Sequence, residues 1–211
     1  MMRSTSFRRL MICLVAFVAT QAVAAVPPAP KLPADAYFLM DATTGQVLVD
    51  HNGDLSLPPA SLTKIMTSYV LAEEVDAGRA SLDDMIKVSR NAWSQNPAFR
   101  GSSLMWIEPG NPVSLGDLER GVVISSGNDA SVAVAEHLAG TESSFVDVMN
   151  QLGAELGLDN TVYRNPHGLP HPEHRTTARD LATLSVALIN GHPEHYKIYK
   201  EQSFTYNGIK Q

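Results

Sequence analysis

Two adjacent prolines, Pro58 and Pro59, place the strongest local constraint on the fold, because they end any preceding strand and introduce a helical pattern. Apolar residues recur after them at helical spacing: Leu62, Ile65, Met66, Tyr69 and Val70. A helix running from here to about residue 75 places Ser61 and Lys64 on one face, with their Cβ atoms about 5–6 Å apart. The sequence therefore predicts a hydroxyl beside an amine at the start of a helix.

This pair has the composition of a catalytic nucleophile and its base. A serine hydroxyl is a poor nucleophile until a base takes its proton, and a lysine with the ordinary pKa of about 10.4 is charged at neutral pH. The positive end of the helix dipole and an apolar pocket would both lower the pKa of Lys64. A Ser-x-x-Lys quartet occurs by chance in roughly every second chain of this length. An exposed helical serine with a solvated lysine is therefore the alternative to catalysis.

Residues 1–25 have the pattern of a secretory signal peptide. Three arginines precede the apolar run 10–18, and small residues follow it up to Ala25. A membrane anchor is less favoured, since a bilayer span takes about 20 residues. Cleavage would place the chain in the periplasm or on the outer face of the cytoplasmic membrane. It would also remove Cys13, the one cysteine, so that packing must stabilise the fold.

Charge and composition narrow the partners and the domain organisation. The formal net charge is −6, which argues against a nucleic-acid partner and offers no broad basic face to anionic lipid. Four prolines in residues 26–35 predict an extended leader, and residues 36–211 are long enough for one domain. No membrane anchor is visible in the rest of the sequence.

The coarse pattern predicts an α/β (α+β) fold, with helices clustered on a small antiparallel sheet. Residues 37–40 and 47–49 read as a hairpin around a turn containing Gly45, and further strands are expected because two strands alone are marginal. Ser114 and Asp117 form a capping box for a helix through residue 124. Further helical patterns cover residues 130–138, 145–156 and 181–189.

A second polar motif, Ser126-Gly127-Asn128, lies between two of these helices, where glycine allows a sharp turn. Ser, Gly and Asn are also the residues that ordinary turns prefer. The presence of Ser61 and Lys64 elsewhere in the chain favours a site over a plain turn.

A group of loop histidines raises the question of a metal site. His167, His171 and His174 are neighbours in the sequence, but their spacing fits no helical ligand pair. Solvated loop histidines are the favoured interpretation, and no metal is expected.

Together the two motifs resemble those of the low-molecular-weight penicillin-binding proteins, the D-alanyl-D-alanine carboxypeptidase family of serine peptidases in the β-lactamase-like superfamily. The likeness is carried by residues 59–67 (PASLTKIMT) and 126–130 (SGNDA). Residues 165–169 (NPHGL) and 177–180 (TARD) match flanking sequence of the family. The likeness to the family extends from about residue 36 to the end of the chain.

The resemblance implies acyl transfer. Ser61 would attack the carbonyl between the last two D-alanines of a peptidoglycan stem peptide, and penicillins would acylate the same serine. Lys64 would accept the proton of Ser61, and Ser126 would relay a proton to the leaving amine. Asn128 would hydrogen-bond the substrate amide and orient Lys64. No metal or organic cofactor is implied.

One motif of the family, Lys-Thr-Gly, is not in this sequence, in which Gln211 follows Lys210. We therefore expect the chain to be the N-terminal part of a longer enzyme, and the activity of this part alone is left open. A D,D-endopeptidase, a β-lactamase and a catalytically inactive peptidoglycan-binding module remain as alternatives.

Overall fold

The structure is a computed structural model that describes residues 28–211, so the predicted signal peptide lies outside the described part. The helices and strands of the described part lie within Pro33–Gln211, which forms one compact unit. Residues 28–32, which belong to the predicted leader, are exposed and have no regular secondary structure. Within the described part, none of the helices combines the length and the apolar character needed to span a bilayer.

The predicted hairpin is present as strands β1 (Tyr37–Met40) and β2 (Val47–His51), which pair antiparallel. Its turn is built locally, because the Asp41 carboxylate accepts the N–H groups of Thr43 and Thr44, and Gly45 adopts a φ of +72°.

No third strand joins this sheet within residues 28–211, contrary to our expectation. The other strands form two separate antiparallel pairs, β3 (Met85–Ile86) with β4 (Val113–Ser114) and β5 (Thr205–Tyr206) with β6 (Ile209–Lys210).

Helix α1 (Lys64–Asp76) contacts four other helices and carries much of the core. The others are α2 (Leu115–Val123), α3 (Asn128–Ala139), α4 (Glu142–Glu155) and α5 (Ala178–Gly191), with the short α6 (Pro193–Tyr196). The chain also contains three short 3-10 helices in its described part, η1 (Ala60–Thr63), η2 (Pro97–Phe99) and η3 (Lys197–Lys200). Met66, Tyr69 and Val70 of the predicted apolar face are buried, whereas Leu62, which lies in η1, is 52% exposed.

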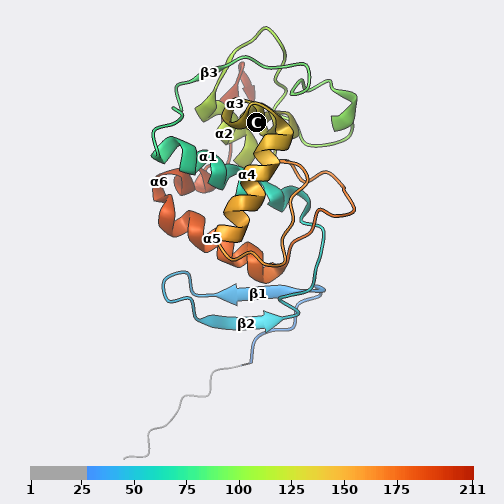
Figure 1. Cartoon of the computed structure of the whole chain (residues 1–211), viewed down its shortest axis with the longest axis vertical. Helices are drawn as coiled ribbons and strands as arrows, with labels where there is room; N and C mark the ends of the chain where they lie inside the picture. The colour runs from blue at the N-terminus through green and yellow to red at the C-terminus, as the bar shows by residue number, and fades with distance from the viewer. Residues whose placement is uncertain (1–27) are drawn as a thin grey trace, which may run out of the picture. The chain divides into compact units, whose positions relative to one another are not determined.

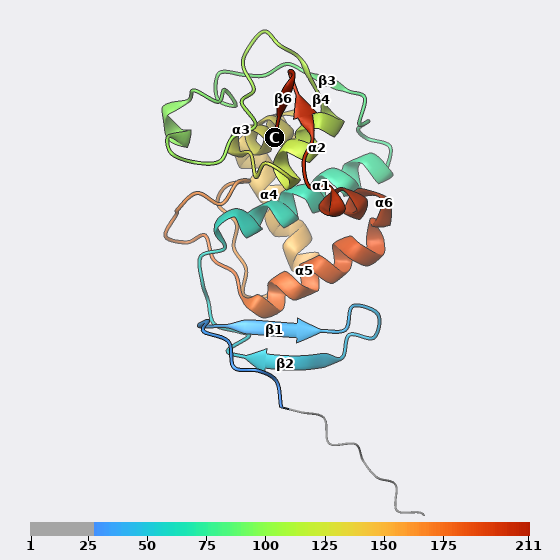
Figure 2. The same cartoon turned by 180° about the vertical axis from the view of Figure 1, so that it is seen from behind.

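Helix α5 lies between the hairpin and the other helices (Figures 1 and 2). Arg179, in its first turn, donates to the carboxylates of Asp50 and Asp54 at 2.6 and 2.7 Å. Its guanidinium also lies 4.6 Å from the centre of the Phe38 ring. The TARD segment therefore attaches the hairpin to the helical cluster.

Two helix starts differ from the prediction. The chain forms the 3-10 turn η1 at Ser61 and becomes α-helical only at Lys64. Helix α3 begins at Asn128 rather than at residue 130, because Gly127 has the extended conformation of an N-cap. The Ser126-Gly127-Asn128 motif therefore forms the N-terminal end of α3, and Asn128 belongs to its first turn.

Candidate active site

Lys64 is the buried centre of the site. Its side chain is 4% exposed, and Nζ donates hydrogen bonds of 2.7 Å to Oδ1 of Asn128 and to the backbone carbonyl of His167. Burial lowers the pKa of Lys64 to about 8, against an opposing effect of the Asp129 charge. A neutral amine has two N–H donors, and both have acceptors here. Its lone pair is therefore left to accept a proton.

Ser61 lies beside this amine on an exposed turn. It belongs to η1, in which residues three apart lie on the same side, so Ser61 and Lys64 remain neighbours as predicted. The structure contains no Ser61–Lys64 hydrogen bond within the described residues, because Nζ is drawn inward by Asn128 and His167. Ala60, immediately before Ser61, has a φ of +48°, a strained value for a residue with a side chain.

A cleft of about 470 Å³ opens over Ser61. Its lining includes Asn128 and His167, so three segments distant in the sequence meet around one space. Residues 101–103 form another part of the lining, and the carbonyl of Ser103 accepts the N–H of Asn128 at 2.9 Å. The cleft can hold a peptide carbonyl next to the Ser61 hydroxyl.

Ser126 stands apart from the other three predicted residues. It is half-buried, has a φ of +53° and is not among the residues that line the cleft in the described part of the chain. The structure thus joins Lys64 directly to Asn128 and places Ser61 with Asn128 on one cleft, but it leaves Ser126 at the margin.

Asp129 was not predicted from the sequence, although it follows Asn128 directly. Its side chain is fully buried and accepts the N–H groups of Met105, Trp106 and Ile107 at 2.8, 2.8 and 3.2 Å. Burial raises the pKa of this carboxyl, and the N–H donors oppose the shift. Because residues 105–107 give their N–H groups to Asp129, they form no strand, and the loop is attached to the start of α3.

The loop of residues 165–169 supplies the carbonyl that Lys64 binds. Asn165 holds it in shape, since its Oδ1 accepts the N–H of Gly168 at 2.6 Å and its Nδ2 donates to Leu169. The carbonyl of Pro166 accepts a 2.6 Å hydrogen bond from Thr67 of α1. The NPHGL segment is therefore part of the site, whereas its sequence predicts only a resemblance to the family.

Gly168 lets this loop approach the Ser61 turn. Its φ is +89°, and a Cβ atom at this position would lie 1.8 Å from the carbonyl oxygen of Ala60. We expect Gly168→Ala to lower the free energy of unfolding by about 2–4 kcal/mol, because backbone on both sides must shift. Urea unfolding followed by circular dichroism would measure the loss.

Gly157→Ala is the matched control for this substitution. Gly157 has a similar φ of +73°, but no atom lies within 4 Å of a Cβ placed there. The control should lose only about 1 kcal/mol, the usual cost of a left-handed backbone. Equal losses in the two variants would show that the contact with Ala60 is unimportant.

Two of the three loop histidines are buried, so the prediction of solvated side chains is wrong for His167 and His174. His174 makes a 2.9 Å hydrogen bond with Thr63, and burial lowers its pKa to about 4. The reason is that the loop packs on the start of α1. No cluster of His, Cys, Asp or Glu in residues 28–211 has the geometry to hold a metal ion.

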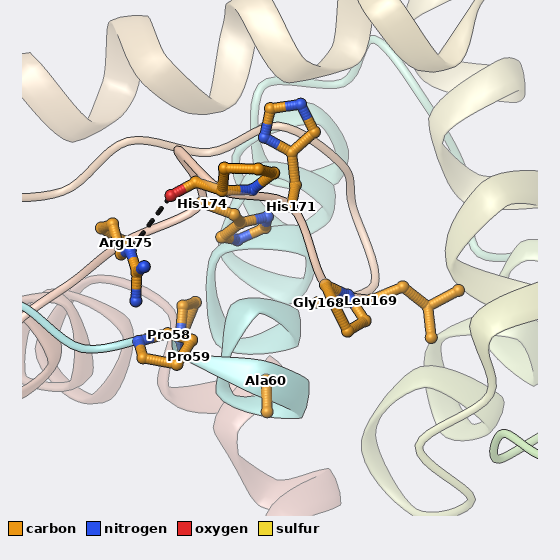
Figure 3. Close-up of a pocket in the computed structure, with 10 residues that line it drawn as sticks. Pro58, Pro59, Ala60, Gly168, Leu169, His171, His174 and Arg175 are labelled. Carbon is orange, nitrogen blue, oxygen red and sulfur yellow. Dashed lines mark hydrogen bonds between the residues drawn. The ribbon is translucent and has the colours of Figure 1, made fainter.

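A larger cavity of about 510 Å³ adjoins the site and is shown in Figure 3. Prolines such as Pro58 and Pro59 line much of it, and Arg175 donates a 3.2 Å hydrogen bond to the carbonyl of Pro172 in its wall. It shares Ala60 and Gly168 with the cleft but contains no predicted site residue. The smaller cleft is therefore the candidate active site.

Most of the chain is similar to known proteins. Residues 21–211 match the family Peptidase_S11, described as D-alanyl-D-alanine carboxypeptidase. D-alanyl-D-alanine carboxypeptidase DacC of Escherichia coli (strain K12) is 49% identical over 197 residues, which cover 93% of this chain and 48% of that protein. The chain thus spans about half the length of the curated relatives it matches.

Solved structures show the same relationship. Penicillin binding protein 6B from Escherichia coli is 46% identical, with a TM-score of 0.85 over 88% of this chain and 59% of that one. Penicillin-Binding Protein D2 from Listeria monocytogenes, solved with bound cefotaxime, is 28% identical, with a TM-score of 0.75 over 87% of this chain and 73% of that one. These matches confirm the predicted fold class and the resemblance carried by the two motifs.

Proposed function

Since the chain belongs to the D-alanyl-D-alanine carboxypeptidase family of serine peptidases, we propose that it removes the terminal D-alanine from peptidoglycan stem peptides through an ester on Ser61. Penicillins acylate the same serine. The observation that carries this proposal is the buried amine of Lys64, which donates hydrogen bonds to Asn128 and to the carbonyl of His167. Lys64 follows the exposed Ser61 by three residues.

The proposed reaction has two halves. In the first, Oγ of Ser61 bonds to the carbonyl carbon as its proton moves to Nζ of Lys64, and the C–N bond then breaks. Lys64 returns this proton to the departing D-alanine nitrogen by way of Ser126, so that D-alanine leaves as an amine and an acyl-enzyme remains. In the second half water attacks the ester carbonyl and gives a proton to Lys64, the bond between the carbonyl carbon and Oγ breaks, and Lys64 passes that proton to Ser61. General-base catalysis of this kind contributes about 10²- to 10⁴-fold to the rate.

Asn128 has two parts in this proposal. Its Oδ1 accepts an N–H of Lys64 and keeps that amine in place, and its position on the cleft allows Nδ2 to donate to a substrate carbonyl. Ser126 is two residues before Asn128, and its φ of +53° gives it a sharply turned backbone. A bound substrate would close the distance between it and the leaving nitrogen.

Export across the inner membrane and a place in the cell envelope belong to the same proposal. They rest on the signal-peptide pattern of residues 1–25 and on the location of peptidoglycan. Within the exported chain, residues 26–35 are the proposed leader, and residues 36–211 belong to the catalytic domain.

Intact-mass analysis after incubation with a fluorescent penicillin tests the proposal. We expect an increase equal to one β-lactam molecule, mapped by peptide digestion to the segment containing Ser61, and release of D-alanine from a pentapeptide ending in D-Ala-D-Ala. A chain that binds the pentapeptide without any covalent adduct would instead be a binding module.

The lifetime of the adduct separates the remaining alternatives. An adduct that persists for many minutes agrees with a carboxypeptidase, whereas rapid hydrolysis of the penicillin would identify a β-lactamase. Cleavage of cross-linked muropeptides in preference to pentapeptides would identify an endopeptidase.

A further inference from the structure

Trp106 is the most exposed aromatic side chain in the part of the chain that the structure describes, at 61%. Its φ is +68°, in the left-handed region that few residues other than glycine adopt. The Asp129 carboxylate maintains this conformation by accepting the N–H groups of Trp106 and of both its neighbours. The backbone at Trp106 is therefore held in place by hydrogen bonds, while the indole is left exposed to solvent.

Beside Trp106 is a cavity of about 260 Å³ that adjoins the active-site cleft. Phe99 and Arg100 line it together with Trp106, and Gly101 lines both this cavity and the Ser61 cleft. A Cβ atom at Gly101 would meet no atom within 4 Å, so the space beside this shared lining residue is open. The loop that carries η2 and the 165–175 loop lie on the same side of the molecule in both views (Figures 1 and 2).

The charge of this cavity is positive. Arg100 is its one charged lining residue, and the guanidinium makes no ion pair within residues 28–211. An arginine beside an exposed aromatic ring can bind a carboxylate through paired hydrogen bonds while the ring covers the apolar part of the same ligand.

We propose that Trp106 and Arg100 form a subsite that binds the acyl part of the substrate and selects an acidic residue there. This inference rests on the proposed function. The leaving group is a single D-alanine, which is small, whereas Trp106 lines the neighbouring cavity and not the Ser61 cleft. A substrate side chain that reaches Trp106 must therefore belong to the part that stays attached to Ser61.

Peptide binding to the 211-residue chain carrying Ser61→Ala and Trp93→Phe tests the subsite, because Trp106 is then its only tryptophan. The probes are a five-residue peptide that ends in D-Ala-D-Ala and has a glutamate directly before that pair, the same peptide with glutamine, and the D-Ala-D-Ala dipeptide. We expect the glutamate peptide to shift the tryptophan emission and to bind about tenfold more tightly than the glutamine peptide.

Substitutions in the subsite should separate its two parts. Arg100→Gln should remove the preference for glutamate. Trp106→Ala, measured by calorimetry, should weaken the binding of both five-residue peptides about tenfold without changing the binding of the dipeptide. Trp106→Phe should restore most of the affinity. Met85→Ala, at a side chain that is 63% exposed in β3, is the control and should change nothing.

Penicillin labelling of the chain with Ser61 intact separates failure of the subsite from failure of the proposed function. Normal labelling with equal binding of the glutamate and glutamine peptides would overturn the subsite and leave the function standing. Absence of labelling would overturn the function. In that case a glutamate preference that Arg100→Gln abolishes would still support the subsite, and equal binding would reject both.

Discussion

Replacement of Ser61 by alanine is expected to reduce acylation by penicillin to less than about 10⁻³ of the wild-type rate. The ester bond of the proposed intermediate forms through Oγ of this residue, and the variant has no atom that can replace it. The side chain is exposed on η1, so its removal should leave the fold unchanged. Fluorescent-penicillin labelling followed by intact-mass analysis would measure the loss, and circular dichroism would check the fold.

Ser103→Ala is the matched control for this experiment. Ser103 is an exposed serine that lines the same cleft, and it binds Asn128 through its backbone carbonyl, which the substitution retains. This control should be labelled like the wild type. An adduct that persists in Ser61→Ala and maps to another residue would show that the nucleophile has been assigned incorrectly.

Replacement of Lys64 by alanine should reduce the acylation rate by about 10²- to 10⁴-fold, because the Ser61 hydroxyl then has no base. The pH dependence should identify the reason. Burial lowers the pKa of Lys64 to about 8. The neutral, proton-accepting fraction therefore increases about tenfold per pH unit below pH 8 and becomes constant above it. Acylation rates measured between pH 6 and 9.5 should follow this curve in the wild type and lose it in Lys64→Ala.

Asn128→Asp provides a direct test of that assignment. The substitution places a carboxylate against the Lys64 amine, 2.7 Å away in the native pair, and should raise its pKa. The pH range in which the acylation rate increases should therefore move upward in Asn128→Asp. The rate of this variant should still approach a plateau in strong alkali. A pH profile that is flat in the wild type, or identical in the two proteins, would exclude Lys64 as the base.

Features that depend on a few consecutive residues were predictable from the sequence. Ser114 accepts the N–H of Asp117 at 3.1 Å, so the predicted cap is present, and Thr141 caps α4 in the same way by accepting the N–H of Ser144 at 3.0 Å. Gly140 ends α3 with a φ of +79°, as expected for a helix C-terminus. These contacts join residues at most four apart, and the residue types that make them are evident in any short window.

Contacts between distant segments were not predictable in this way. The acceptor of the second Lys64 hydrogen bond is a backbone carbonyl 103 residues away, and a carbonyl leaves no mark on residue type. The role of Gly168 depends on Ala60, and that of Asp129 on residues 105–107. The burial of His167 and His174 was missed for the same reason, since it arises from packing of their loop on α1.

The sequence by itself determined the chemical groups and their local order: Ser61 three residues before Lys64, and Ser126 two residues before Asn128 at the entrance to a helix. The tertiary structure alone decided that Lys64 is buried, that Asn128 and His167 occupy its donors, and that its pKa is lowered to about 8. The physical reason is that local hydrogen bonding depends on neighbours in the chain. Desolvation depends instead on whichever segments the fold packs around a charge.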